Sequence, residues 1–135
     1  MSAPGPVLAL VLLAGYMCAG CGASDRAPEA AAVAHRFEAA LDGGDGRAAC
    51  AQLSDNTASK LEQDEGRPCE QAILDAQLPA GRAVAHTSVH VTSAYVSLTH
   101  GGALFLDEAP GGWEVSAAGC RPTGADLPYE CDLEN

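Results

Sequence analysis

Residues 83–118, with the sequence AVAHTSVHVTSAYVSLTHGGALFLDEAPGGWEVSAA, decide the fold of this chain. Apolar and polar side chains alternate here with a period of two, and valine, threonine and aromatic residues are frequent, which is typical of β-strands. We predict four strands, over residues 83–91, 94–99, 103–109 and 112–118. The turns Gly101-Gly102 and Pro110-Gly111-Gly112 are hairpin signals between the last three of them. The stretch therefore predicts an antiparallel meander.

The chain before this stretch has a helical pattern instead. Val33, Phe37 and Leu41 recur at spacings of four, which predicts an amphipathic helix over residues 29–42, ended by Gly43-Gly44. Three shorter helices are predicted to follow: one from about residue 46 capped by Asp45, one over 56–65 closed by Gly66, and one from Pro68-Cys69 to Pro79. Helices first and hairpins second indicate an α+β domain, with N-terminal helices packed on one face of a curved antiparallel sheet of about four strands.

Several segments resemble one known fold. A first helix ending in LDGGD, small helices around AQLSDNTASKLE and strands finishing in GGWEV are similar to the nuclear transport factor two-like fold, also called SnoaL-like. The closing WEVSAAGCRP and PYEC are similar to small bacterial lipoproteins with such a domain. The resemblance covers about residues 29–121 and implies a cone-shaped space between helix and sheet, in which enzymes of this fold hold an Asp or His as acid or base. A cystatin-like helix-on-sheet domain is the alternative.

The N-terminal segment has the pattern of an export signal. Residues 7–19 are almost wholly apolar, but a helix of that length spans roughly 20 Å, short of the ~30 Å hydrocarbon core of a bilayer. The small residues Ala19 and Gly20 before Cys21 suit a peptidase that admits small side chains. The stretch resembles a bacterial lipoprotein signal, which implies that Cys21 receives a diacylglyceryl lipid. A cleaved signal without lipid and a membrane-retained segment are the alternatives.

These signals divide the chain into a lipoprotein signal peptide (residues 1–20), a tether (21–28) and a single α+β domain (29–135). The rival interpretations of Cys18 and Cys21 are a thioredoxin-like redox pair and a haem attachment site. The redox pair would have to open a helix after a strand, and the haem site would need His where Gly22 stands. We therefore expect localisation to the cell membrane, lipid-anchored on its extracytoplasmic face.

The charge of the chain narrows the choice of partner. The formal net charge is −11, and every charged residue follows Cys21. The electrostatic field of so much negative charge repels nucleic acid and anionic lipid headgroups. Nucleic-acid binding is therefore excluded, and membrane contact must come from the covalent lipid. The expected partners are the membrane, through the lipid, and an envelope protein or a small ligand.

Four further cysteines follow Cys21, at positions 50, 69, 120 and 131. An even number in a small exported chain favours two disulfides. The local pairing, Cys50 with Cys69 and Cys120 with Cys131, is preferred over the two crossed pairings. A zinc site is disfavoured because the four thiols are widely spaced. We predict no cofactor.

Asp107 is the candidate acid or base. On its predicted strand it shares a side with Phe105, while Leu104 and Leu106 occupy the other. Inside an apolar cone its pKa would rise into the range of a general base. The alternative is a solvated carboxylate at a strand end. A cone filled by large side chains would exclude the catalytic hypothesis, and the residues expected to fill it are Phe37, Leu41, Phe105 and Trp113.

The histidines carry weaker hypotheses. His86 and His90 are four residues apart, but four residues of strand span about 13 Å, too far for both rings to bind one ion at about 2.1 Å. With Val89 and Val91 expected to face the interior, both should face water. We predict no metal site, and we expect the two remaining histidines on the surface, at His35 and His100.

The aromatic and hydroxyl residues are expected to define the faces of the sheet. Trp113 should anchor the core against the helices together with Val115. The strand over residues 94–99 alternates an apolar set with a polar set, and the polar set consists of Tyr95, Ser97 and Thr99. We assign no catalytic residue. The leading hypothesis is a lipid-anchored extracytoplasmic binding or accessory domain without catalytic activity. The alternative is an anchored SnoaL-like isomerase or hydratase that uses a pocket carboxylate.

Overall fold

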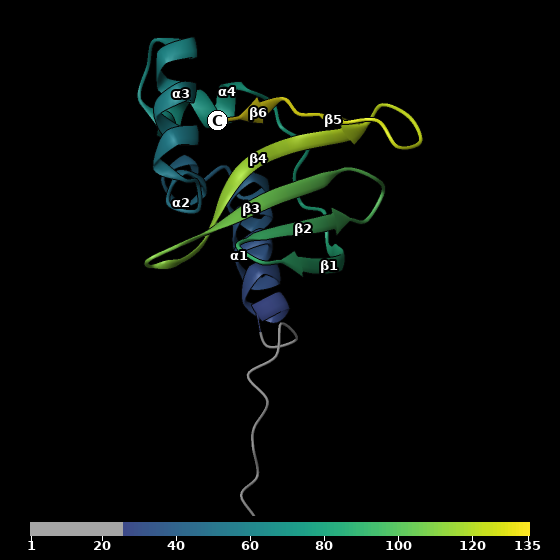
Figure 1. Ribbon diagram of the computed structural model, residues 1–135. Coiled ribbons are helices and arrows are strands. Elements are labelled where there is room, and N and C mark those ends of the chain that lie inside the picture. The colour runs from purple at the N-terminus through teal and green to yellow at the C-terminus, as the bar shows by residue number, and fades with distance from the viewer. Residues whose placement is uncertain (1–25) are drawn as a thin grey trace, which may run out of the picture.

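The computed structural model describes residues 26–135, so the signal peptide, Cys21 and the tether up to residue 25 lie outside the described residues. Four helices come first, α1 (Arg26–Asp42), α2 (Gly46–Cys50), α3 (Asp55–Glu65) and α4 (Cys69–Asp75). Six strands follow, β1 (Val84–His90), β2 (Ser93–Leu98), β3 (Ala103–Ala109), β4 (Gly112–Pro122), β5 (Tyr129–Glu130) and β6 (Leu133–Glu134). Figure 1 shows α1 crossing the sheet and the other helices grouped beyond one of its edges. The α+β class is confirmed.

The first helix begins three residues before the predicted start. Residues 26–28, which we expected in the tether, belong to α1. Pro28 is tolerated there because the N–H groups of a first turn have no partner within the helix. The Arg26 side chain also fixes the helix start, since its Nη1 donates to the Val91 carbonyl oxygen at 2.7 Å.

Two of the short helices, α2 and α3, have side-chain caps at their starts, and α3 ends at the predicted glycine. Asp45 caps α2 by accepting a hydrogen bond from the Ala48 amide at 3.0 Å, and Ser54 caps α3, which ends at Gly66 in the left-handed conformation. The fourth helix stops at Asp75, well before Pro79. It stops early because Gln77 has a positive φ of 51°, which no α-helix accommodates.

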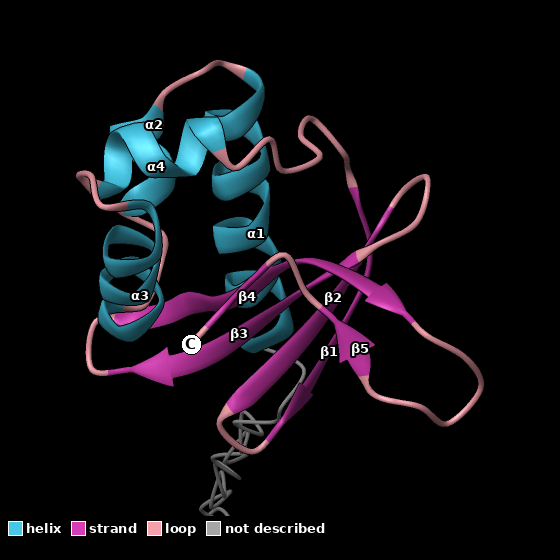
Figure 2. Ribbon diagram, turned by 90° about the horizontal axis from the view of Figure 1, so that it is seen from above, coloured by secondary structure: helices cyan, strands magenta, loops and turns pink. Residues whose placement is uncertain are grey.

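The four predicted strands form the meander, in the order β1-β2-β3-β4, and every pairing between named strands is antiparallel. The sheet has six strands rather than four because β4 runs on to Pro122 and pairs with two short strands from the C-terminal segment, β5 at its far end and β6 nearer its middle. The predicted end of β4 at residue 118 was therefore wrong. Figure 2 shows the C-terminal segment folding back beside β4.

Both disulfides have the local pairing. Cys50 at the end of α2 is bonded to Cys69 at the start of α4, and Cys120 on β4 is bonded to Cys131 between β5 and β6. The first joins two helices that lie very close together. Gly46 of α2 is so near α4 that a Cβ at this position would lie 1.9 Å from the Glu70 carbonyl oxygen. The second fixes the C-terminal segment to β4.

Candidate functional site

The space between α1 and the sheet is filled. Phe37 of α1 is fully buried and packs in one core with side chains from three strands, namely Val96, Leu104, Leu106 and Val115. Trp113 is buried at 7% exposure and belongs to the same core, which confirms its predicted role with Val115. The part of the sheet that would line a SnoaL-like cone is therefore occupied by apolar side chains.

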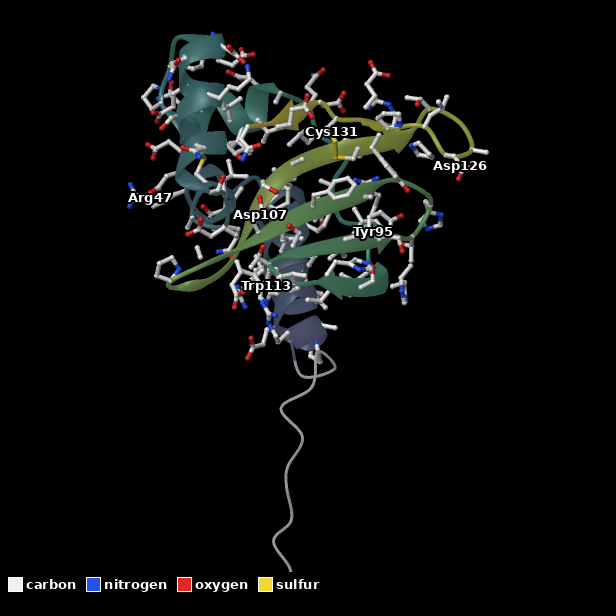
Figure 3. The ribbon with its side chains drawn as sticks, in the orientation of Figure 1. Arg47, Tyr95, Asp107, Trp113, Asp126 and Cys131 are labelled. Atoms are coloured by element: carbon white, nitrogen blue, oxygen red, sulfur yellow. A yellow bond between two sulfur atoms is a disulfide. The ribbon has the colours of Figure 1, made fainter. Side chains whose placement is uncertain are left out.

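Asp107 does not face this space. It lies half-buried on the opposite face of β3 and accepts a hydrogen bond from the Ser93 hydroxyl at 2.9 Å; Figure 3 labels it on the strand. The alternation was predicted correctly, but Leu104 and Leu106 take the face toward α1 because they bury more apolar surface. Phe105, expected to fill the cone, is accordingly on the outer face as well, and the hypothesis of Asp107 as a pocket base is wrong.

The histidines are exposed, as predicted. His86 and His90 lie on β1 with their side chains in solvent, and His100 lies in the β2–β3 turn. Val91, expected to face the interior, is instead 83% exposed because it forms the β1–β2 turn with a positive φ of 55°. Within residues 26–135, no three His, Cys, Asp or Glu side chains gather as metal ligands.

The outer face of the sheet carries an aromatic cluster of Tyr95, Phe105 and Tyr129. The ring centroids of Phe105 and Tyr129 are 5.3 Å apart, and the two tyrosine hydroxyl oxygens lie 3.1 Å apart. The hydrogen bond with Tyr129, together with burial, raises the pKa of Tyr95. Tyr95, expected on the polar face of β2, does lie on the side opposite the core, in contact with the Cys120–Cys131 region.

The ionisable site of the domain is a cleft at the other end of α1, and sequence analysis missed it. Glu38 is 2% exposed, and one of its carboxylate oxygens, Oε2, accepts a hydrogen bond from the Arg82 amide at 3.0 Å. The other, Oε1, lies 3.6 Å from Arg82 Nη2. The cleft, of about 200 Å³, lies between α1 and the chain entering β1, and its lining also includes His35, Asp42 and Gly81.

The polar atoms of this cleft are incompletely paired. Glu38 Oε1 and Arg82 Nε and Nη2 are buried and have no hydrogen-bond partner among the described residues, while Arg82 Nη1 donates to the Gly101 carbonyl at 2.7 Å. Burial raises the pKa of Glu38, and the Arg82 amide and guanidinium oppose the rise. The site can thus hold a proton at a buried carboxyl, beside a guanidinium whose donors are not all paired.

The signal for Glu38 was present in the sequence. Val33, Ala34 and Phe37 define the buried stripe of α1, and Glu38 follows Ala34 by four residues, on the same face. Arg82 gave no such signal, since it lies in an irregular segment between α4 and β1.

Comparisons of the chain with protein-family models, with curated proteins and with solved structures found no match. Among the described residues, no helix combines the length and the apolar character that crossing a membrane requires.

Proposed function

We propose that this chain is an exported lipoprotein, anchored by a lipid on Cys21 at the outer face of the cell membrane, and that its domain is a binding or accessory module without catalytic activity. The ligand is an envelope protein or a small polar molecule. The observation that carries the absence of catalytic activity is the filled interior, because apolar side chains packed around Phe37 occupy the space that a SnoaL-like cone would offer to a substrate.

Two further features support the proposed localisation outside the cytoplasm. The disulfides Cys50–Cys69 and Cys120–Cys131 are typical of small domains that mature outside the reducing cytoplasm. The apolar segment over residues 7–19 is short and precedes a cysteine after two small residues, which is typical of a lipoprotein signal. We also propose that the domain is SnoaL-like, since its first helix lies across one face of an antiparallel meander.

Expression of the full chain in a bacterial host tests the anchor. We expect the protein in the membrane fraction, resistant to extraction by salt, with an intact mass that lacks residues 1–20 and includes a diacylglyceryl group. The variant Cys21→Ala should lose this mass and should not be anchored through lipid. A native protein that retains its first twenty residues, or that carries no lipid, would contradict the proposal.

A second candidate function is acid–base catalysis by a pocket carboxylate, as in an isomerase or hydratase. Glu38 favours it over Asp107, because Glu38 is buried, has a raised pKa and lines a cleft. The test is a panel of small carbonyl and hydroxyl compounds. This function predicts that one of them raises the melting temperature of the wild type and is turned over, and that Glu38→Gln loses the turnover but keeps the fold. A compound that binds equally to both proteins without reacting would favour the binding function instead.

A further inference from the structure

The start of α1 is fixed near the ends of two hairpins of the sheet, β1–β2 and β3–β4. Arg26 Nη1 donates to the Val91 carbonyl oxygen at 2.7 Å, and Nη2 forms an ion pair with Glu108. The guanidinium carbon also lies 5.1 Å from the centre of the Trp113 ring. We call the region formed by Arg26 and the turns at residues 91–92 and 110–111 the tether end. Figure 1 shows the start of α1 at the bottom of the described part and the β3–β4 turn projecting to the left, and Figure 3 labels Trp113 beside α1.

The tether end lies close to the residue proposed to carry the lipid. Cys21 and Arg26 are five positions apart. A chain of that length spans at most about 18 Å, whatever its conformation, because each residue adds no more than ~3.6 Å. The Glu38 cleft lies at the other end of the helix, about 18 Å from Arg26 in the direction of the helix axis, since twelve helical residues separate Arg26 from Glu38.

Val91 gives this end an apolar tip. Among the large hydrophobic side chains of the described region it is the most exposed, at 83%. Its φ of 55° is also a conformation that β-branched residues rarely adopt and that glycine or asparagine would take with less strain. A glycine at this position would form the turn equally well and with less strain. The fold therefore does not explain the valine, and a contact made by its exposed side chain explains it better.

We propose that the tether end is a membrane-contact surface: in the lipidated protein, Val91 rests on the bilayer and the Glu38 cleft faces away from it. This inference rests on the proposed lipid anchor. Charge does not create the contact, because Glu29 and Glu108 lie at this end and anionic headgroups repel them. The covalent lipid must therefore hold the surface in place, and the apolar tip then sets the orientation.

The orientation is measured on the lipidated full chain in vesicles of phosphatidylethanolamine and phosphatidylglycerol with brominated acyl chains, which quench nearby fluorophores. A fluorescent amino acid is incorporated at position 91 in one protein and at position 65, at the far end of α3, in another. We expect loss of most of the fluorescence at position 91 and little loss at position 65. Equal quenching at the two positions would overturn the orientation.

A second measurement needs no introduced label. Trp113 is the single tryptophan of the chain, so its emission reports on the tether end directly. We expect the bromolipids to quench it in the lipidated wild type and not in Cys21→Ala mixed with the same vesicles. In lipidated Val91→Gly the quenching should weaken, although the substitution relieves backbone strain and should not lower the melting temperature. Unchanged quenching in Val91→Gly would overturn the role of the valine.

The two proposals fail in different ways. The intact mass is measured first, and a mass without lipid refutes the anchor and the orientation together. A lipidated protein with equal quenching at positions 91 and 65 refutes the orientation alone.

Discussion

The two ends of α1 are joined to the sheet by the same two residue types in opposite environments. At the tether end, Arg26 pairs with Glu108, and their side chains are 33% and 45% exposed. At the cleft end, Glu38 pairs with Arg82, and their side chains are 3% and 14% exposed. In both cases the helix contributes one charge and the chain of the β-sheet region contributes the other.

Because the two ion pairs differ in burial, we expect them to contribute differently to the stability of the domain. An exposed ion pair contributes about 0–1 kcal/mol because water screens it. A buried pair gains little over an apolar contact, but removal of one partner is severe, since the other charge then stays buried without compensation. The buried pair at the cleft end should therefore contribute more to the stability of the domain. The exposed pair at the tether end should mainly fix the position at which α1 begins.

Removal of Arg82 is the largest effect we predict. Arg82→Ala leaves Glu38 buried without its counter-charge and also removes the hydrogen bond to the Gly101 carbonyl. We expect a loss of about 3 kcal/mol in the free energy of unfolding. Urea denaturation measures it as a lower midpoint with an unchanged slope.

Arg26→Ala is the matched control, because it deletes the same atoms from the exposed pair. We expect a loss of about 1 kcal/mol, from the ion pair with Glu108 and the contact with the Trp113 ring. Equal losses in the two variants would show that burial does not distinguish the two pairs.

The elements that sequence predicts well are those specified by local chemistry. The hairpins follow from alternation and from the glycine turns, the helix caps follow from Asp45 and Gly66, and the disulfides follow from the proximity of the segments that carry them. Each of these depends on residues that are neighbours in the chain or become neighbours through one turn.

The features that sequence did not predict depend on contacts between distant segments. The strands β5 and β6 have two residues each and no alternation, and they form because β4 and the Cys120–Cys131 bond hold the C-terminal segment in place. Glu38 was overlooked because a glutamate in a helix is usually solvated, and its partner Arg82 lies 44 positions away. The face of Asp107 depended on which side of β3 meets α1, which alternation alone does not determine.

The pH dependence of stability gives the last and smallest contrast between the two ends. Burial raises the pKa of Glu38 above its usual 4.5, so the folded protein binds a proton that the unfolded chain has released. The stability that this proton contributes is therefore complete below about pH 4.5 and is lost as the pH rises through the raised pKa. The effect should be smaller than that of Arg82→Ala, because the Arg82 amide and guanidinium partly offset the burial.

Glu38→Gln cannot ionise, so unfolding free energies measured across this range should fall less with pH than those of the wild type. Parallel profiles would mean that Glu38 titrates alike in the folded and unfolded chains, and the cleft end would then lose its distinction from the exposed pair at Arg26.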